Sequence, residues 1–441
     1  MKAKAMLLFI SFACAQSVYS FGQVDCSTSN QLVCQFPVSA TTLAKYQIGG
    51  TAAYQQAEKI ANPINAAIAT QLTQLPVPSA TVGVVSLRQK GSEVGVPFDN
   101  LGPVLTDRPD TVGKGHVFMG FSFQHFNFNA MDGLDLGSFP TAFTYNASTP
   151  LCNTCAATVT GYANVTSNVG FKLDQYVGMV TIGLSRTTDI SVIVPVSSVS
   201  IAVTSSNFTN YTYDSSTGIY NNATNPSLTP VSSTGSASGI GDVMVNFKQL
   251  VIGQEGSRAA VAAGATFRFP TGDSLNFLGS GALGGSAYGL FEYRARLAPH
   301  LKISYQWNDS SVLMSLGNTT GSGRLPGGLQ YAGGADLKIN RHLTLGADIL
   351  GNQFVNAPTL SLSTVSFGPV PPTSSGVPAT YSSETESPST YTTANFSAGL
   401  KWSPIPHFLL YGNVMLQMNN VGLRSDPVPL FGIAYNFGKR K

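Results

Sequence analysis

Twelve stretches within residues 115–437 alternate between apolar side chains and small or polar ones, and this period of two constrains the fold most strongly. Successive side chains of a β-strand point to opposite faces, so each stretch predicts a strand with one apolar face. Each is long enough to cross a membrane, since about 9–11 tilted residues suffice. The predicted strands are approximately 115–128, 168–185, 190–205, 239–252, 258–270, 284–297, 300–312, 327–338, 342–355, 392–402, 407–418 and 428–437.

The connections between these stretches alternate strictly in length. The short ones are 185–189, 253–257, 297–300, 339–342 and 403–407, and the long ones are 129–167, 206–238, 271–283, 313–326, 356–391 and 419–427. Short periplasmic turns and long external loops are typical of outer-membrane barrels, whereas a soluble sandwich has no reason to sort loop lengths by side. The sequence therefore predicts an all-β protein, a transmembrane antiparallel up-and-down β-barrel of about twelve strands over residues 115–437.

The two faces of the predicted strands differ in charge. The face predicted to meet lipid carries Val243, Val245, Phe247, Val261, Phe267, Phe269, Phe291, Tyr293, Leu301, Ile303, Tyr305, Trp307, Leu343, Leu345, Ile349, Phe396, Leu400, Trp402, Phe408, Leu410, Val414 and Leu416, with no charge among them. Of the aromatic side chains, Trp307, Trp402, Tyr411 and Tyr435 are candidates for the interfacial girdles. The charged side chains in the opposite phase are Lys172, Asp174, Asp242, Lys248, Arg268, Glu292, Arg294, Arg296, Lys302, Asp336, Lys338, Asp348 and Lys401.

An Arg or Lys on the lipid face near the bilayer midplane costs about 2–4 kcal/mol, so these charges are predicted to line the interior of the barrel. Two interpretations stay open. The charges pair with one another and fill a narrow lumen, or they form a selectivity ladder in a channel. For a ladder, the candidates are Lys248, Arg268, Arg294 and Arg296, with Asp242 and Glu292 as counter-charges.

The composition and the N-terminus agree with an exported membrane protein. Only 10% of the residues are charged, well below the roughly 25% of soluble proteins, and a net charge of +3 gives no reason to expect a nucleic-acid partner. Residues 1–15 have the pattern of a signal peptide, with Lys2 and Lys4 before an apolar run and a small-x-small cleavage site at Ala13-Cys14-Ala15. No later stretch approaches the ~20 apolar residues of a membrane helix.

Residues 16–114 do not have the strand pattern. Ile60, Ile64, Ile68 and Leu72 recur at helical spacing, and Asn62-Pro63 is a helix-start signal, which predicts short helices. Residues 79–114 are rich in turn residues. The segment is either a periplasmic cap or a plug in the lumen. The cap is preferred, because the helices have one clear apolar side and the segment is short for a separately folded plug. Residues 438–441 form a C-terminal tail.

Four cysteines remain after the predicted cleavage, Cys26, Cys34, Cys152 and Cys155. An even number in an oxidising compartment favours disulfides, and proximity in the sequence suggests the pairs Cys26–Cys34 and Cys152–Cys155. A zinc or redox role for the second pair has less support, because no Cys or His pair of matching spacing accompanies it. No metal and no cofactor is predicted.

The final strand carries alternating aromatic residues. Gly432, Tyr435 and Phe437 resemble the assembly signal of outer-membrane barrels, Gly-x-x-aromatic-x-aromatic, which implies recognition by the barrel assembly machinery. Leu430 and the four residues after Phe437 depart from that pattern. In a barrel, this strand pairs with the first one, because an open sheet edge cannot satisfy its backbone groups in lipid.

Four short sequences in the middle of the chain carry a resemblance to a family. Gly239-Ile-Gly-Asp-Val243, Phe267-Arg-Phe-Pro-Thr-Gly-Asp273, Leu329-Gln-Tyr-Ala-Gly-Gly-Ala335 and Asn340-Arg-His-Leu-Thr-Leu345 resemble sequences of the meta-pathway phenol-degradation family of Gram-negative outer-membrane proteins. The resemblance extends over roughly 170–437. It implies a monomeric barrel among outer-membrane lipids that passes small hydrophobic or aromatic solutes.

The sequence thus predicts a non-enzymatic outer-membrane protein, a passive uptake channel for small hydrophobic or aromatic compounds. One alternative is a closed structural or surface-display barrel whose loops bind a partner. Another is an outer-membrane lipid hydrolase with His125 as the base and a serine on a neighbouring strand, although no particular serine stands out in the sequence.

Overall fold

The computed structural model describes residues 30–39, 64–77, 101–147, 159–214, 219–224, 230–253, 257–314, 323–367, 379–405 and 407–437. The predicted signal peptide, the C-terminal tail and the cysteines Cys26, Cys152 and Cys155 lie outside these residues. Cys34 is buried and disulfide-bonded, while the predicted cysteine pairings stay predictions.

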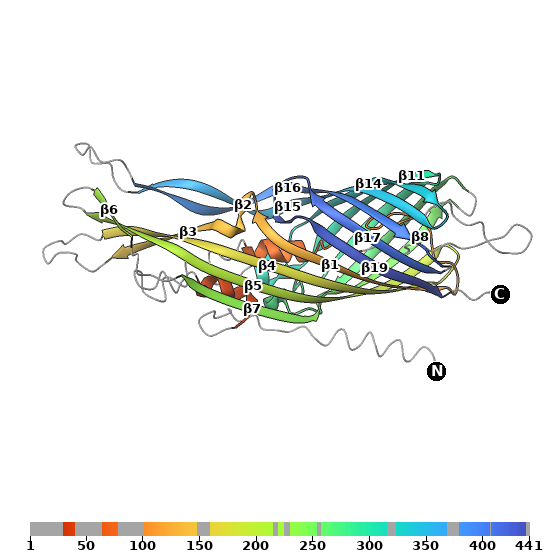
Figure 1. Ribbon diagram of the computed structural model, residues 1–441, viewed down its shortest axis with the longest axis horizontal. Helices are drawn as coiled ribbons and strands as arrows, with labels where there is room; N and C mark the ends of the chain where they lie inside the picture. The colour runs from red at the N-terminus through yellow and green to blue at the C-terminus, as the bar shows by residue number, and fades with distance from the viewer. Residues whose placement is uncertain are drawn as a thin grey trace, which may run out of the picture.

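The described residues form a closed antiparallel barrel, as the sequence predicts (Figure 1). Its strands are β1 (Val117–Met131), β4 (Val159–Gly183), β5 (Thr188–Asp214), β7 (Val231–Ile240), β8 (Val243–Ile252), β9 (Ala259–Phe269), β10 (Gly284–Tyr293), β11 (Leu297–Asn308), β14 (Gly327–Asn340), β15 (Leu343–Phe367), β16 (Ala379–Trp402), β17 (Phe408–Gln417) and β19 (Val428–Phe437). Strands β7 and β8 pair in succession with β5 and act as one barrel strand, which gives twelve strands over the described residues.

The barrel is closed by the first and last strands. Strand β1 pairs with β4 on one side and with β19 on the other, in register from Val117↔Phe437 to Gln124↔Leu430. This closure is the pairing predicted for the C-terminal strand. It leaves no free sheet edge within the barrel wall, as a hydrocarbon environment requires.

Four of the strands continue far past the barrel wall. Strands β4, β5, β15 and β16 have 25, 27, 25 and 24 residues, and Figure 1 shows them projecting from one end as long hairpins. The connections 129–167, 206–238 and 356–391 are therefore not mainly loops, which corrects the prediction. They also contain β2 (Leu134–Asp135), β3 (Phe139–Ala147) and β6 (Ile219–Thr224). Their Thr, Val and Tyr residues favour strands even where no membrane surrounds them.

Short turns lie at the opposite end of the barrel, which we call the short-turn end. One of them is shifted from its predicted position, because β11 begins at Leu297 and residues 294–296 form the turn. Short elements occupy some of the other connections: β12 (Ser310–Ser311) with β13 (Gly323–Arg324), β18 (Leu423–Ser425), and the 3-10 helices η2 (Leu136–Ser138), η3 (Ser274–Asn276) and η4 (Val312–Met314).

The outward face is apolar, as predicted. Phe267, Ile303, Leu345 and Trp402 are exposed, as are the alternate residues Phe431, Ile433, Tyr435 and Phe437 of β19. Tyr411 is an exception among the predicted girdle residues, because it faces inward and is buried. An apolar belt of this kind around a closed barrel is the surface that lipid contacts.

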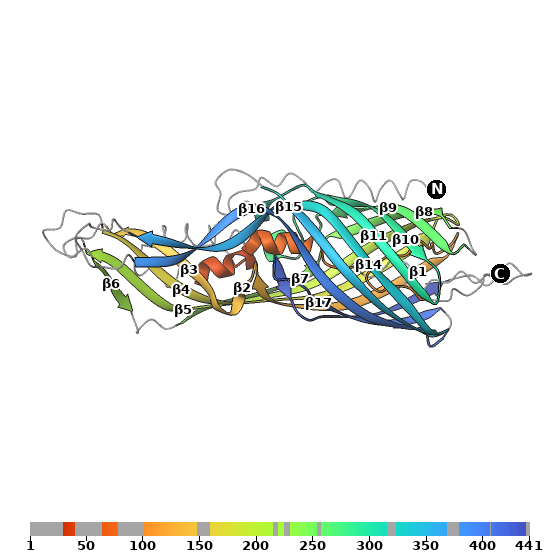
Figure 2. The same ribbon diagram turned by 90° about the horizontal axis from the view of Figure 1, so that it is seen from above.

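Helical residues 32–39 and 64–72 lie inside the outline of the barrel and its hairpins (Figure 2). The first group starts with the 3-10 helix η1 (Leu32–Cys34). They pack among apolar side chains near the end with the long hairpins. The rings of Phe36 and Phe139 lie edge to face at 6.0 Å, and Ile64 and Ile68 are buried in the same cluster.

None of the described helices has both the length and the apolar character needed to span a bilayer.

Candidate functional site, an occluded cavity in the lumen

Residues 101–112, the inner segment, lie against inward-facing side chains at the short-turn end of the barrel. Arg108 is 3% exposed, and its guanidinium donates two hydrogen bonds to the carboxylate of Glu292 on β10, at 3.1 and 2.7 Å. A second carboxylate, that of Asp110, lies 3.3 Å from Arg108 and 2.5 Å from Arg294. A two-pronged Arg–carboxylate bond in a buried place is among the stronger and more directional polar contacts in proteins.

The other contacts of the inner segment come from around the barrel wall. Lys248 of β8 donates to the backbone oxygen of Arg108 at 2.9 Å and lies 3.5 Å from the Asp107 carboxylate. Lys401 of β16 donates to the backbone oxygens of Leu101 and Pro103. The backbone N–H of Val112 donates to Asp189 of β5 at 2.9 Å. Four barrel strands thus hold the inner segment through buried charges.

These contacts correct the preferred interpretation of the N-terminal region. A periplasmic cap would leave Glu292, Lys248 and Lys401 without residues 101–112, yet all three are buried against them. Residues 101–112 are a plug in the lumen. The limits of the N-terminal domain, 16–114, stay a prediction.

Residues 30–39 and 64–77, the outer segment, occupy the lumen toward the long hairpins. The backbone oxygen of Thr73 accepts hydrogen bonds from Arg268 at 3.2 Å and from Gln306 at 3.3 Å. Gln124 donates to the oxygen of Pro76 at 3.0 Å. A cation at the C-terminal end of a helix stabilises its unpaired carbonyls, so Arg268 holds the end of helix 64–72 in place.

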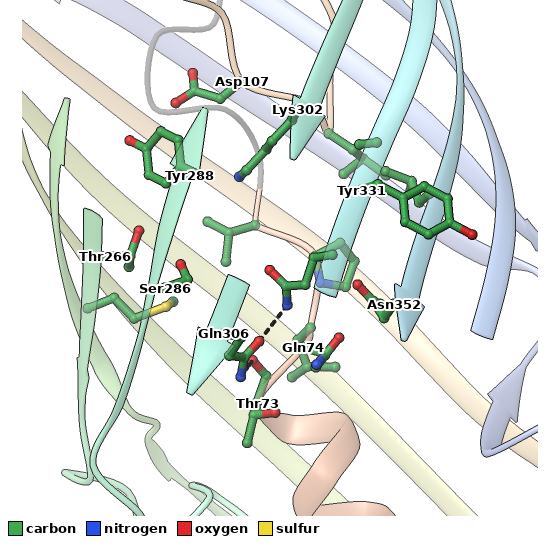
Figure 3. A pocket seen from close by; sticks show the side chains of 18 of the residues that line it. Thr73, Gln74, Asp107, Thr266, Ser286, Tyr288, Lys302, Gln306, Tyr331 and Asn352 are labelled. Atoms are coloured by element: carbon green, nitrogen blue, oxygen red, sulfur yellow. Dashed lines mark hydrogen bonds between the residues drawn. The ribbon is translucent and has the colours of Figure 1, made fainter. Parts of the chain in front are cut away.

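A cavity of about 230 Å³ separates the two segments (Figure 3). The outer segment contributes Gln74, Leu75 and Val77 to its wall, and the inner segment contributes Leu105 and Asp107. The remaining wall comes from the inward faces of the strands. Described parts of the N-terminal region therefore lie on both sides of the cavity.

The cavity wall combines amide groups with apolar side chains. Figure 3 shows Tyr288, Lys302 and Asp107 toward one end and Thr73 and Gln74 toward the other. Gln330 donates to Gln306 at 2.5 Å, and the Tyr288 hydroxyl donates to Asn246 at 2.8 Å. The apolar lining residues are Leu105, Ile193, Met244, Leu350 and Met415, and some lie beside polar ones, as Met244 does beside Asn246 on β8. A wall of this composition suits a small amphiphilic molecule.

A buried histidine lies near the inner segment. His300 of β11 is between two aspartates, with Nδ1 3.3 Å from Asp336 and Nε2 2.5 Å from Asp348. The sequence placed His300 in a turn, but it belongs to a strand and faces inward. Both aspartates were predicted to be interior, and they are.

Most of the predicted interior charges do face inward. Of the thirteen charges predicted to be interior, seven are buried, namely Asp242, Lys248, Arg268, Glu292, Asp336, Asp348 and Lys401. Lys302 lines the cavity, and Arg294 pairs with Asp110. Arg296 and Lys338 lie near the short-turn end, where Arg296 Nε is 3.5 Å from the Lys338 oxygen. Of the predicted counter-charge pairs, Asp242 lies 3.6 Å from Arg268, whereas Glu292 binds the inner segment.

Lys172 and Asp174 were predicted to face the interior, and this prediction is wrong. On β4 the buried, inward residues are Phe171, Leu173 and Gln175, so the two charges between them face outward. The Asp174 carboxylate lies 2.6 Å from His125 Nδ1 on this outer surface. The charges lie past the aromatic pair Phe123–Tyr176, toward the long hairpins, where an outward side chain can be solvated.

His125 does not have the surroundings that the hydrolase alternative needs. Its ring contacts Asp174, and no serine hydroxyl in the described part of the chain is hydrogen-bonded to it. Asp174 pairs in register with Ser198 on β5, so the carboxylate lies between the histidine and that serine. In a Ser–His–Asp triad the histidine lies between the serine and the aspartate, so the order of His125, Asp174 and Ser198 is not that of a triad.

The sequence analysis missed the charged residues of the inner segment. Asp107, Arg108 and Asp110 fall in a turn-rich stretch and were not singled out. A usable signal was present, since these three charges lie close together and are flanked by the apolar residues Val104, Leu105 and Val112 in a region without strand or helix pattern. The cavity amides were also missed, because uncharged residues on an inward face look alike in sequence.

The fold and the contents of the lumen define the class of protein, an outer-membrane β-barrel whose interior holds residues 30–39, 64–77 and 101–112 of its own chain. Within this class, residues 156–313 match the family model described as "Putative MetA-pathway of phenol degradation", which confirms the resemblance over that part of the chain. The match includes two of the four motifs noted in the sequence, at 239–243 and 267–273.

Other comparisons give weaker likenesses. The COG4313 outer membrane channel from Pseudomonas putida F1 is 11% identical, with 75% of this chain and 98% of that chain covered and a TM-score of 0.42. The CymD monoaromatic hydrocarbon channel is 10% identical, with 82% and 99% covered and a TM-score of 0.33. The NanC porin is 8% identical, with 68% and 98% covered and a TM-score of 0.31. No curated protein matches the chain.

Proposed function

We propose that this protein is a passive uptake channel of the outer membrane for small hydrophobic or aromatic compounds, without enzymatic activity. The observation that carries the proposal is the cavity of about 230 Å³ in the lumen, which lies between the inner segment and the outer segment. The alternative of a closed structural barrel does not explain a cavity between the inner segment and the outer segment. The family match and the aromatic compounds named for the CymD channel are in accord with the proposed solute.

The structure describes a closed state, so transport requires the inner segment to move. Its charged side chains pair with the barrel wall, while Leu101, Val104, Leu105 and Val112 pack in the apolar cluster. The charges can be rehydrated when the lumen fills with water. The outer segment is more apolar. We propose that a solute enters through the outer end, occupies the cavity, and leaves after the inner segment is released.

Uptake by intact cells tests the proposed function. Cells that express the protein should take up labelled benzyl alcohol and toluene faster than cells that lack it. Equal uptake rates, at equal amounts of assembled barrel in the outer membrane, would leave the surface-display alternative.

A single substitution tests the inner segment as the seal. Replacing Arg108 with alanine leaves the buried Glu292 without its partner, which costs about 3–5 kcal/mol in the closed state. The variant should open more often and raise the conductance of planar bilayers. Arg186→Ala is the matched control, because the Arg186 side chain is exposed in a turn. Closed traces from both variants would contradict the proposal.

The assembly of the protein is part of the same proposal. We infer that the barrel functions as a monomer and that the assembly machinery recognises Gly432, Tyr435 and Phe437. Tyr435 and Phe437 are exposed on the outward face of β19, where another protein can reach them before the barrel closes.

A further inference from the structure

The charges that line the cavity are predominantly positive. Arg268, Lys302 and Arg424 lie in its wall, and Asp107 is the acidic residue among the described lining residues. Positive groups in a water-poor site raise the local concentration of anions. The cavity therefore favours a ligand with a negative group over a neutral one.

Two of the three cations already have partners. Arg268 donates to Asn308 at 2.7 Å and lies 3.6 Å from Asp242. Arg424 donates to the oxygen of Ala394 at 2.9 Å and to Asn395 at 2.6 Å. Both arginines are thus held against the wall, and their role in the closed state is structural.

Lys302 differs from the two arginines. In the described part of the chain its ammonium makes no hydrogen bond and no ion pair, and its contact is with the Tyr288 ring, whose centroid lies 5.0 Å from Nζ. Figure 3 shows the side chain reaching into the cavity beside Tyr288. An ammonium has three donors, and a ring face satisfies none of them fully. The cavity holds a cation whose hydrogen bonds a ligand can supply.

The other features of the cavity limit the rest of the ligand. The lining also includes the apolar side chains Leu105, Ile193, Met244, Leu350 and Met415, which suit a ligand with an apolar part. The volume of about 230 Å³ exceeds the ~150 Å³ of an engineered cavity that binds benzene and is below the ~300–1,000 Å³ of sites for drug-sized ligands. A single substituted ring has the right size.

From these observations we propose that the cavity is a binding site for small aromatic carboxylates, with the carboxylate on Lys302 and the ring in contact with apolar side chains of the lining. This inference rests on the proposed channel function and names the class of solute. Binding is noncovalent. Asp107 lies toward the same end of the cavity as Lys302, and its carboxylate is 3.5 Å from the ammonium of Lys248.

Calorimetric titration of the purified full-length protein in detergent tests the inference, with benzoate and benzyl alcohol as probes. The two probes share the ring and differ in charge. The wild type should bind benzoate more tightly than benzyl alcohol. In Lys302→Met the ratio of the two affinities should fall about tenfold or more, the effect expected for loss of a charge-assisted hydrogen bond.

Lys172→Met is the matched control, because Lys172 is exposed on the outer surface of β4. It removes the same charge from the chain and should leave the ratio unchanged. Heat-modifiable migration of each variant confirms that the barrel has assembled. A wild type that binds benzoate no better than benzyl alcohol, or a Lys302→Met variant with an unchanged ratio, would overturn the inference.

Cell uptake separates this inference from the channel proposal. If cells take up benzyl alcohol through the protein while the protein binds no benzoate, the channel stands and the carboxylate site is wrong. If the protein binds benzoate with the expected dependence on Lys302 but cells gain no uptake of any probe, the site stands and the channel is wrong.

Discussion

At the scale of single residues, Gly432 has a packing role that is independent of any assembly signal. A Cβ at this position would overlap the ring of Tyr411, which lies across the glycine from the neighbouring strand β17. Glycine is required because the ring needs that space. Gly432→Ala should destabilise the barrel by about 1–3 kcal/mol, the usual cost of overpacking. Urea unfolding in detergent or lipid measures the difference.

Gly289→Ala is the control for this prediction, because nothing lies within 4 Å of the Cβ that it adds. It should leave the unfolding free energy nearly unchanged. In a double-mutant cycle, Tyr411→Leu should relieve most of the effect of Gly432→Ala. A large effect of Gly432→Ala that persists without the tyrosine ring would show that the glycine acts through recognition during assembly.

Asp132 links the β1–β2 turn to β15 and to the connection after β17, at the end of the barrel with the long hairpins. It forms, with Gly133, the tight turn between β1 and β2, and both residues have positive φ, 50° and 82°. Asp-Gly is a preferred sequence for such turns. The carboxylate accepts backbone hydrogen bonds from Leu360 and Gly422, each at 2.8 Å. Burial raises the pKa of Asp132, and the two backbone hydrogen bonds offset this effect only in part.

This raised pKa predicts a pH dependence. The folded state holds the Asp132 proton more tightly than the unfolded state, so stability falls as the pH rises from about 4, the unfolded value, through the raised pKa. Asp132→Asn removes the dependence. The variant should match the wild type below about pH 4 and gain on it as the pH rises. Unfolding titrations across this range measure the difference, and a wild type that gains on Asp132→Asn with rising pH would refute the prediction.

At the scale of strands, the alternation of side chains predicted the barrel correctly, and its errors have a physical cause. Lys172 and Asp174 were assigned to the interior because a charge is costly on a lipid face. That reasoning fails where a strand leaves the membrane, since β4 continues for many residues into the hairpin and its outward side chains meet water. Period and charge fix the phase of a strand only within the bilayer.

Two of the family motifs meet in the structure. Asp242 lies where β7 gives way to β8, and its carboxylate accepts from the backbone N–H groups of Gly272 and Ser280 at 3.2 and 2.8 Å. Thr271 donates to the oxygen of Gly241 at 2.6 Å. The motif at 239–243 thus folds the connection after β9 back onto the barrel. Sequence alone could not show this contact, because the motifs are far apart along the chain.

The outward face of strand β11 allows a prediction of what a charged side chain costs there. Ile303 is 49% exposed on the outward face, in the middle of the strand. Ile303→Arg should destabilise the folded barrel by about 2–4 kcal/mol if that position is near the bilayer midplane. Ile339→Arg, next to the last residue of β14, is the control and should cost about 0–1 kcal/mol, as for positions near the interface. Equal costs in lipid vesicles would mean that lipid does not surround this face.

At the scale of the whole molecule, the position of residues 101–112 could not be predicted from the sequence. The inner segment has no regular pattern, and its partners Lys248, Glu292 and Lys401 are distant in the sequence and come from separate strands. Each partner was predicted to be interior, yet the charges that neutralise them were sought on other strands. The sequence predicted the interior charges, but their counter-charges lie on residues 101–112, for which a periplasmic position was preferred.

The inner and outer segments together predict how the conductance of the channel changes when one of them is removed. Replacing residues 101–112 with a Gly-Ser linker of equal length keeps the outer segment tethered and removes every charge contact of the inner segment. Water can then hydrate Glu292, Lys248 and Lys401, so the barrel should remain assembled while the short-turn end opens. Bilayer conductance should rise above that of the wild type. A further deletion of residues 16–100 should raise it again, because the apolar outer segment still narrows the lumen. If the linker variant conducts no better than the wild type while the full deletion does, the outer segment alone closes the channel and the inner segment serves only to stabilise the barrel.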